Sequence, residues 1–343
     1  MINFAKRALL APGWKANATG SLKLEEEKSG LFPVLIAAKI EIAAGIFSFE
    51  FRDPKGGELP SFTPGSHLTV QVPNGLLRKY SLCNDAFERD RYVIAAKRDA
   101  VGRGGSVSLA DKTKAGGTIS ILAPRNDFPL AESRSGYIFI AGGIGITPIM
   151  SMIRHANAAG GRFKLYYCTR SPEVTAFAAE LNAPEFKAQT IIHHDGGDPA
   201  RLLDLWPVLE KPKGQHVYCC GPRPLMDAVR DMTGHWSASA IHFESFADGA
   251  PVRPDDREFI VRVAGSDKTI SVPPGTTILE ALRREGFQVA SSCESGTCGT
   301  CRTKLIAGQP DHRDFVLGEA DRHNSIMLCV SRALSSELVI ALS

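Results

Sequence analysis

Cys293-Glu-Ser-Gly-Thr-Cys-Gly-Thr-Cys301 places three cysteines in a short loop rich in small residues. The spacing is C-x4-C-x2-C, and Cys329 follows 28 positions after the third cysteine. This spacing is typical of plant-type [2Fe–2S] sites. The glycine, serine and threonine residues between the cysteines allow backbone N–H groups to approach the cluster sulfides and offset their negative charge. The sequence therefore predicts a [2Fe–2S] cluster held by Cys293, Cys298, Cys301 and Cys329.

A structural zinc ion is the alternative occupant of this loop. Four-cysteine zinc sites usually contain two C-x2-C pairs, and this sequence has only one of them. The remaining cysteines are scattered along the chain, and no signal-peptide pattern precedes the first predicted strand. We therefore expect a cytoplasmic protein. Clustered cysteines in such a reducing compartment bind metal more often than they form disulfides.

Composition excludes several classes of partner. The 343 residues correspond to two or three domains, and 43% hydrophobic residues are enough for sizeable cores. The formal net charge is +3 without a basic block, so nucleic acid is not expected as a partner. No apolar run reaches the ~18 residues of a membrane span. We expect a monomer that binds neither nucleic acid nor membrane.

Hydrophobic patterns divide the chain into three folded regions. Short strands separated by turn residues, from residue 31 to 131, predict an antiparallel β-barrel. Strands that alternate with helices, from 132 to 246, predict a parallel α/β sheet, with helices at 149–159, 174–181, 201–209 and 224–232. Residues 258–343 predict a small α+β ferredoxin domain. Residues 1–30 are interpreted as an extension of unknown role, and residues 247–257 as a linker.

Two glycine-containing loops follow strands of the predicted parallel sheet. Ala141-Gly-Gly-Ile-Gly-Ile-Thr-Pro lies between a strand and a helix, and Cys220-Gly-Pro follows a later strand. The first loop is not the G-x-G-x-x-G fingerprint and could be a simple tight turn. Ligands of open α/β sheets bind at the carboxyl ends of the strands. Two such loops at one edge therefore favour a nucleotide site.

Two motifs in the barrel region could bind a phosphorylated aromatic ligand. Arg78-Lys-Tyr-Ser-Leu lies on a predicted strand, where an arginine and a tyrosine share one face. Gly102-Arg-Gly-Gly-Ser precedes a short helix and could offer N–H groups to a phosphate. An ordinary half-exposed strand and a flexible loop are the alternatives.

Together and in this order, the motifs resemble those of the phthalate dioxygenase reductase family. In that family a flavin barrel, a nicotinamide domain and a C-terminal plant-type ferredoxin share one chain. The barrel motifs resemble its flavin strand and FMN-phosphate loop. The glycine loops resemble the nicotinamide loops of the wider ferredoxin–NADP reductase superfamily. His242-Phe-Glu-Ser-Phe resembles the segment that brings an aromatic residue near the flavin. The resemblance covers residue 31 to the C-terminus.

The resemblance also implies roles for individual residues. Ser81, Thr147 and Phe246 would lie where the nicotinamide meets the flavin, with Tyr80 packed on the flavin ring. The FMN phosphate would be bound by basic residues and loop groups, namely Arg78, Lys97, Arg98, Gly104, Gly105 and Ser106. The dinucleotide would be bound by Gly142, Gly143, Gly145, Thr147, Arg170, Ser171, Cys220, Gly221 and Pro222.

The function implied by the resemblance is that of an oxygenase reductase component. Electrons would pass from NADH through FMN and the [2Fe–2S] cluster to a Rieske aromatic-ring dioxygenase such as phthalate dioxygenase. NADPH as donor and FAD as flavin stay open. A vanillate-type demethylating monooxygenase or a cytochrome P450 is an alternative acceptor. A redox-sensing or zinc-stabilised binding protein without catalytic activity is the alternative from another class.

Overall fold

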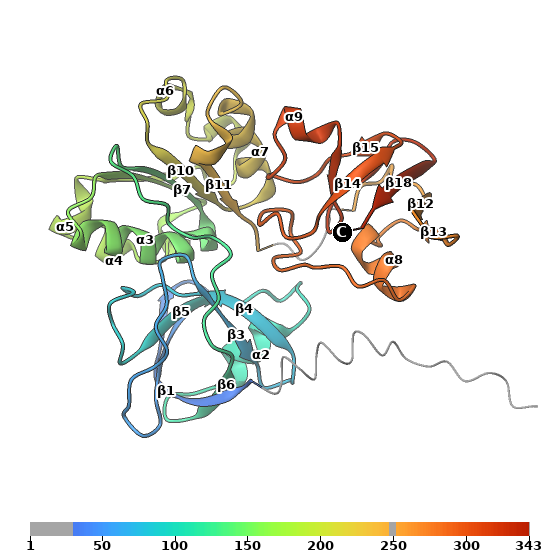
Figure 1. Cartoon of the computed structure of the whole chain (residues 1–343). Coiled ribbons are helices and arrows are strands. Elements are labelled where there is room, and N and C mark those ends of the chain that lie inside the picture. The colour runs from blue at the N-terminus through green and yellow to red at the C-terminus, as the bar shows by residue number, and fades with distance from the viewer. Residues whose placement is uncertain (1–29, 247–251, 343) are drawn as a thin grey trace, which may run out of the picture.

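The computed structural model describes residues 30–246 and 252–342, which form three units (Figure 1). The barrel (residues 32–121) lies below the other two in this view. The parallel-sheet unit (residues 137–244) and the C-terminal unit (residues 259–341) lie side by side above it. The predicted extension, apart from Gly30, and residues 247–251 of the predicted linker lie outside the described residues. No described helix is long and apolar enough to cross a membrane.

The barrel is a six-stranded antiparallel sheet with strand order β4-β3-β6-β1-β2-β5. Alternate side chains point inward and form its core, as Phe49 and Phe51 do on β2. The two edge strands, β4 and β5, meet through a single bridge between Leu82 and Ile94. The strands are β1 (Phe32–Ala43), β2 (Ile46–Arg52), β3 (His67–Gln71), β4 (Leu77–Ser81), β5 (Tyr92–Lys97) and β6 (Thr118–Ile121). Between β5 and β6 lies the helix α2 (Gly105–Lys112).

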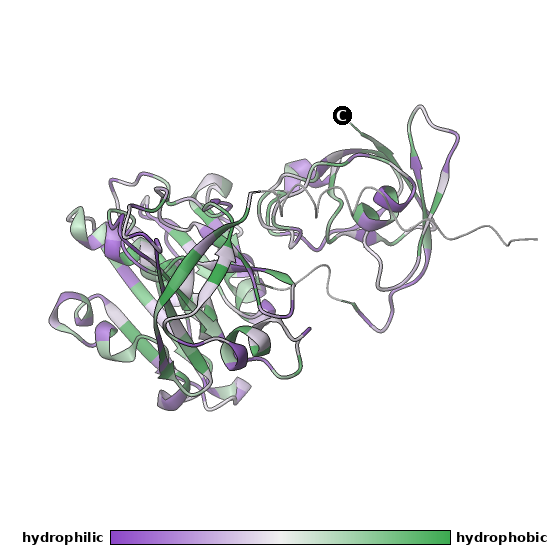
Figure 2. Cartoon of the chain, turned by 90° about the horizontal axis from the view of Figure 1, so that it is seen from below, coloured by the Kyte–Doolittle hydropathy of each residue, from purple (hydrophilic) through white to green (hydrophobic). Residues whose placement is uncertain are grey.

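The parallel-sheet unit has five strands in the order β11-β10-β7-β8-β9, all parallel. Figure 2 shows hydrophobic residues along many strands of the chain, and the central strands β7 and β10 of this sheet are almost fully buried, as in sheets that are covered on both faces. The strands are β7 (Tyr137–Gly142), β8 (Phe163–Thr169), β9 (Thr190–His194), β10 (His216–Cys220) and β11 (Ile241–Glu244). The two long helices are α3 (Ile146–Ala158) and α7 (Arg223–Met232).

Two helices predicted in this unit are much shorter than expected. The segment 174–181 is helical only in α4 (Ala178–Leu181), because Phe177 adopts a left-handed conformation with φ 58° and interrupts the helix. The segment 201–209 is helical only in α6 (Trp206–Leu209). Residues 184–187 form a further short helix, α5 (Pro184–Lys187). The predictions for these boundaries are wrong, whereas the strand–helix alternation is confirmed.

The C-terminal unit contains a mixed sheet with strand order β13-β12-β18-β14-β16. β12 and β13 form an antiparallel hairpin, and α8 begins after a capping box of Thr277 and Glu280. The elements are β12 (Phe259–Val263), β13 (Thr269–Val272), α8 (Ile278–Arg284), β14 (Arg302–Ala307), β16 (Ser325–Met327) and β18 (Glu337–Ala341). A small second sheet pairs β15 (Pro310–Asp311) with β17 (Arg332–Ala333), and α9 (Glu319–Arg322) lies before β16.

Specific side chains join the three units. Arg154 of α3 donates to the backbone oxygen of Cys83 in the barrel and pairs with Glu180 at 2.5 Å. In the C-terminal unit, Phe315 packs against Phe243 of the parallel-sheet unit, with ring centroids 4.8 Å apart. The Arg223 guanidinium lies 4.3 Å from the Phe315 centroid. These contacts place the described residues of all three units in one compact assembly.

Candidate electron-transfer site

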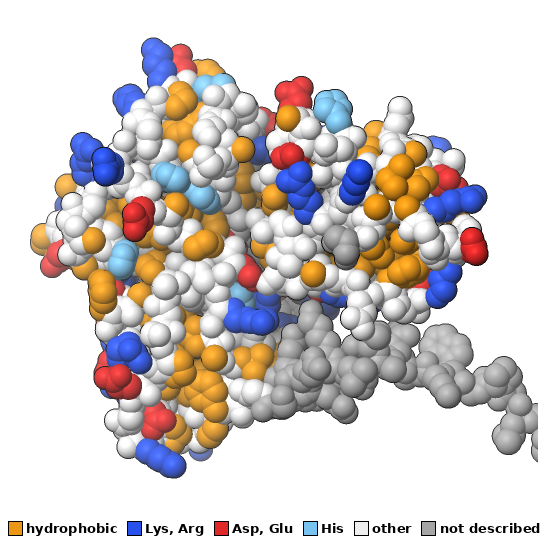
Figure 3. All heavy atoms as spheres, viewed as in Figure 1, with side chains coloured by type: hydrophobic (Ala, Val, Ile, Leu, Met, Phe, Trp, Pro, Cys, Tyr) orange, Lys and Arg blue, Asp and Glu red, His pale blue; other side chains and the backbone are white. Residues whose placement is uncertain are grey.

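A cavity of about 270 Å³ opens at the seam of the barrel, between β4 and β5. Figure 3 shows a hollow where the barrel meets the units above it, with Lys and Arg side chains at its edge. Eight of the sequence-predicted flavin and nicotinamide residues line this cavity: Arg78, Tyr80, Ser81, Lys97, Gly105, Ser106, Thr147 and Phe246. The structure therefore brings together residues that lie up to 168 positions apart in the chain.

The seam explains why so much of one strand reaches the cavity. Alternation predicts that Arg78 and Tyr80 face away from Lys79 and Ser81, but all four line the cavity. Because only one bridge joins β4 to β5, the edge of β4 stays open and both of its faces border the gap. Ser81 is buried. Tyr80 is half-buried, and its burial raises the pKa of its hydroxyl to about 12.

One end of the cavity has the chemistry of a phosphate site. The helix α2 begins after Gly104, whose φ is 78°, and no side chain caps its first N–H groups. Gly105 lies so close to Arg78 that a Cβ atom would stand 2.7 Å from Nε. Free N–H groups, the helix dipole and nearby basic side chains favour an anion. These residues fit the terminal phosphate of FMN, which the chain would bind with Arg78, Lys97 and the start of α2.

Some predicted phosphate residues lie elsewhere, and other residues were missed. Arg98 does not line the cavity; its guanidinium contacts both carboxylate oxygens of Asp111, at 2.9 and 2.8 Å. Gly104 lies at the start of α2 without lining the cavity. The sequence analysis did not assign seven lining residues to the site, namely Lys79, Ala95, Ala96, Asp99, Gly102, Arg103 and Ile144. Two adjacent alanines on a strand look like ordinary core, and only their small size signals that a flat ring could approach.

The predicted nicotinamide loops meet at the carboxyl edge of the parallel sheet. β7 and β10 are neighbours, with Ala141 opposite Cys220. A Cβ atom on Gly145 would stand 2.2 Å from the Cys220 carbonyl oxygen, and one on Gly142 would stand 2.6 Å from Pro222 Cδ. These glycines are therefore required by the contact between the two loops. Thr147, which follows on α3, is buried and its Oγ1 donates to the Ile144 carbonyl at 2.9 Å.

We expect Gly145→Ala to destabilise the parallel-sheet unit. The added methyl group would overlap the backbone of Cys220, which cannot move as a flexible side chain can. Overpacking of this kind costs about 1–3 kcal/mol. The free energy of unfolding, measured with a chemical denaturant, should fall by this amount, and NADH should bind more weakly. Gly234→Ala, whose φ is not left-handed and whose Cβ atom would meet nothing closer than 3.8 Å, is the control for the glycine-to-alanine change without the clash. Equal losses in both variants would contradict the role of the loop contact.

The remaining dinucleotide residues lie at the end of β8, apart from the cavity. Arg170 is exposed, and its carbonyl accepts from Gly196 N–H at 2.9 Å. The Ser171 carbonyl accepts from Thr175 Oγ1 at 2.8 Å. Gly143, with φ 53°, and Gly221 belong to the two loops that meet at this edge. The adenosine roles of Arg170 and Ser171 stay predictions.

The four cysteines of the C-terminal unit form two pairs. Cys293 N–H points to the Cys298 sulfur at 3.4 Å, and Ser295 N–H points to the Cys293 sulfur at 3.4 Å. A hydrogen bond from Cys298 lowers the pKa of the Cys293 thiol to about 4, and a hydrogen bond from Cys329 lowers the pKa of Cys301. The loop can fold so tightly because Glu294, Gly296 and Gly299 all have positive φ.

Two thiol pairs suit a cluster of two irons, each of which would be bound by two sulfurs. Within the described ranges, no group of three or more His, Cys, Asp or Glu side chains is placed to hold a metal ion. A single zinc ion would need four ligands around one point. The donor set is entirely cysteine, and backbone N–H groups already point at the sulfurs. The loop therefore fits a [2Fe–2S] cluster bound by Cys293, Cys298, Cys301 and Cys329.

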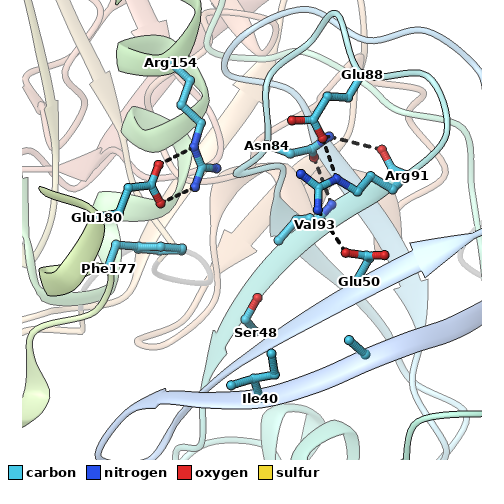
Figure 4. A pocket seen from close by; sticks show the side chains of 11 residues that line it. Ile40, Ser48, Glu50, Asn84, Glu88, Arg91, Val93, Arg154, Phe177 and Glu180 are labelled. Carbon is cyan, nitrogen blue, oxygen red and sulfur yellow. Dashed lines mark hydrogen bonds and ion pairs between the residues drawn. The ribbon is translucent and has the colours of Figure 1, made fainter. Parts of the chain in front are cut away.

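A second cavity, of about 460 Å³, lies between the outer surface of the barrel and α3 (Figure 4). It shares no residue with the predicted sites. Arg154 is paired with Glu180, and Arg91 is paired with Glu50 and Glu88. These arginines are thus already neutralised by carboxylates, so they offer no open anion site. We interpret this cavity as a gap between two packed units.

Comparison with known proteins agrees with this geometry. Residues 139–231 match the family described as the oxidoreductase NAD-binding domain, and residues 261–334 match the 2Fe-2S iron-sulfur cluster binding domain. The reductase subunit of phthalate 4,5-dioxygenase from Pseudomonas putida is 54% identical, over 93% of this chain and 99% of the relative. Phthalate dioxygenase reductase from Burkholderia cepacia is 52% identical, over 92% of this chain and 99% of the relative.

A solved structure of phthalate dioxygenase reductase covers 92% of this chain and 99% of its own, with a TM-score of 0.67 and 52% identity. It is described as a modular structure for electron transfer from pyridine nucleotides to [2Fe–2S]. The division into separate units, with a nucleotide-type parallel sheet and a cysteine loop, agrees with that description. The chain is an oxidoreductase that belongs to the phthalate dioxygenase reductase family.

Proposed function

We propose that this protein is the monomeric reductase component of a Rieske-type aromatic-ring dioxygenase, with phthalate dioxygenase as its terminal oxygenase. Electrons pass from NADH through FMN to the [2Fe–2S] cluster and then to the oxygenase. One observation carries the proposal: the seam cavity and the cysteine loop are in direct contact, since Lys79 of the cavity donates to the Ser292 carbonyl at 3.1 Å. When bound, FMN would supply the conversion between the two-electron chemistry of NADH and the one-electron chemistry of the cluster.

The residues of the cavity would bind and orient the reactants. Tyr80 would pack on the flavin ring, and the buried Ser81 hydroxyl would hydrogen-bond to its polar edge. Arg78 and the first N–H groups of α2 would hold the phosphate. Thr147 lies at the start of α3, where the parallel-sheet unit borders the cavity, and would orient the nicotinamide. Phe246, which is 46% exposed, would cover the open side of the cavity.

Each of the three units would bind one redox partner. We assign residues 31–131 to FMN, residues 132–246 to NADH and residues 258–343 to the cluster, with 247–257 as the linker. The family matches at 139–231 and 261–334 support the second and third assignments. The uncapped start of α2 supports FMN over FAD, because it suits a terminal phosphate.

The choice of phthalate dioxygenase as the acceptor rests on the sequence identities to known reductases. The phthalate reductases are 54% and 52% identical, whereas a vanillate O-demethylase oxidoreductase from a Pseudomonas strain is 37% identical. A structure of the cytochrome P450 CYP116B46 from Tepidiphilus thermophilus is 32% identical and matches over only 42% of its own chain. These differences favour phthalate dioxygenase as the acceptor over a vanillate-type monooxygenase or a P450.

A reconstitution experiment tests the proposal. The purified holoprotein is mixed with the oxygenase component of phthalate dioxygenase or of vanillate O-demethylase, and product is measured with NADH and with NADPH. We expect phthalate oxidation with NADH, and much slower turnover with the vanillate oxygenase or with NADPH. Faster support of the vanillate oxygenase would refute the assigned acceptor, and a preference for NADPH would refute the assigned donor.

A further inference from the structure

Three residues from distant parts of the chain meet between the seam cavity and the cysteine loop. Lys79 lies on β4 between Arg78 and Tyr80, Asp127 lies on the segment after the barrel, and Ser292 directly precedes Cys293. Lys79 Nζ donates to the Ser292 carbonyl at 3.1 Å and lies 3.5 Å from Asp127 Oδ2. Ser292 Oγ donates to Asp127 Oδ1 at 2.7 Å. The three contacts close a triangle, which we call the junction clamp.

Each residue of the junction clamp contacts both of the others. Asp127 uses both carboxylate oxygens: Oδ1 accepts a hydrogen bond from Ser292, and Oδ2 forms an ion pair with Lys79. Asp127 is 20% exposed and Lys79 is 47% exposed, so the pair is only partly screened by solvent. A charged pair of this kind that also shares a neutral partner fixes both distance and orientation better than an isolated surface ion pair.

Two other titratable groups face the clamp, and neither competes with it near pH 7. Glu244, at the end of β11, has a buried Oε2 atom without a hydrogen-bond partner. Burial, and then the charge of Asp127, raises the pKa of Glu244 to about 8, so this carboxyl group is largely protonated. Burial, and then the charge of Lys79, lowers the pKa of His67 to about 4.

The position of the clamp couples the flavin cavity to a cluster ligand. One end belongs to the strand that carries Arg78 and Tyr80, and the other end is the residue before Cys293. FMN, when bound, would supply electrons singly to the cluster, which would pass each one to the acceptor before it takes the next, and the loss of two electrons would release one proton from the flavin to solvent. The rate of each transfer falls exponentially with the distance between the two centres, so small displacements matter.

We propose that Lys79, Asp127 and Ser292 are positioning residues that hold the Cys293 loop at a fixed distance from the flavin and thereby set the rate of flavin-to-cluster electron transfer. The inference rests on the proposed function. It assigns to these side chains a role that does not involve contact with the reacting atoms. Lys79 also lines the cavity, so the test uses Asp127 and Ser292, which do not line it.

The test compares Asp127→Ala and Ser292→Ala with the wild-type holoprotein. Stopped-flow absorbance after mixing with NADH separates flavin bleaching from cluster reduction, and freeze-quench EPR counts the reduced cluster. We expect flavin bleaching within about twofold of wild type and cluster reduction several-fold slower, because the rate of electron transfer falls with every ångström of added separation between the two centres. Hydrogen exchange of the backbone from 292 to 301 should accelerate in both variants. Ser292→Thr, which keeps the hydroxyl group, should restore both properties.

Controls keep the outcomes distinct. Asp90→Asn, which breaks an exposed ion pair with Arg52 elsewhere on the barrel, should change neither rate. If Ser292→Ala loses iron, Asp127→Ala decides the matter, because Asp127 lies far from the cysteines in the sequence. Wild-type rates and exchange in Asp127→Ala at full FMN and iron content would overturn the clamp. Failure of wild-type protein to reduce its cluster with NADH would overturn the proposed function instead.

Discussion

Cys298→Ser is expected to abolish NADH-driven cytochrome c reduction while NADH still bleaches the flavin. Cys298 forms a pair with Cys293, and the hydroxyl group of serine is a poor substitute for a thiolate as a ligand of iron. Loss of a ligand should exceed the ~10–100-fold losses seen when outer-shell partners are removed. The flavin cavity contains no residue of the cysteine loop, so hydride transfer to the flavin should proceed.

The measurement uses two assays on the same preparation. Cytochrome c reduction reports electrons that leave through the cluster, and anaerobic flavin absorbance reports the first step. Cys168→Ser, at a half-buried free cysteine on β8, is the matched control and should retain its iron and both activities. If Cys298→Ser kept normal cytochrome c reduction, the ordered path through the cluster would be wrong.

Arg78→Leu is expected to weaken FMN binding about 10- to 100-fold, because hydrogen bonds to charged groups contribute ~1.5–3 kcal/mol. Arg78 borders the uncapped start of α2, where a Cβ atom on Gly105 would stand 2.7 Å from its Nε atom. Leucine keeps part of the aliphatic packing but removes the charge. Fluorescence titration of the apoprotein with FMN measures the change. Riboflavin, which lacks the phosphate, should bind the variant and the wild type with similar affinity.

Arg98→Leu is the matched control for this experiment. Arg98 is bound by Asp111 and does not line the cavity, so its loss should leave FMN affinity within about twofold, as expected for an exposed surface pair. The resemblance to reductases of this family placed both arginines near the phosphate. If both variants lost the same FMN affinity, Arg98 would bind the phosphate as the resemblance implies, and its position outside the cavity would be misleading.

Local signals in the sequence were sufficient for the main architecture. The cysteine spacing indicated the C-terminal unit, because few cofactors use C-x4-C-x2-C with a distant fourth cysteine. Period-two alternation indicated the barrel strands, and strand–helix alternation indicated the parallel sheet. The helix boundaries failed where backbone geometry decides them. Nothing in the residue type of Phe177 predicts its left-handed conformation, after which the helix expected at 174–181 begins only at Ala178.

The arrangement of the site residues depends on tertiary contacts that the sequence does not show. The open seam between β4 and β5 brings Lys79 and Ser81 into the cavity, although alternation assigns them to the other face. The glycines of the two nucleotide loops are fixed by contact between β7 and β10, which a single loop sequence does not reveal. The junction clamp joins residues 165 and 213 positions apart, and no pattern in the sequence connects the three of them.

The most direct test of the account is an anaerobic titration of the holoprotein with NADH, followed by absorbance and EPR. One flavin accepts two electrons and one [2Fe–2S] cluster accepts one, so about 1.5 NADH should reduce both centres fully. We predict that flavin absorbance is lost and the signal of a reduced [2Fe–2S] cluster appears within this range. A colourless protein, or a cluster that stays oxidised while the flavin is fully bleached, would contradict the claim that the two centres are connected.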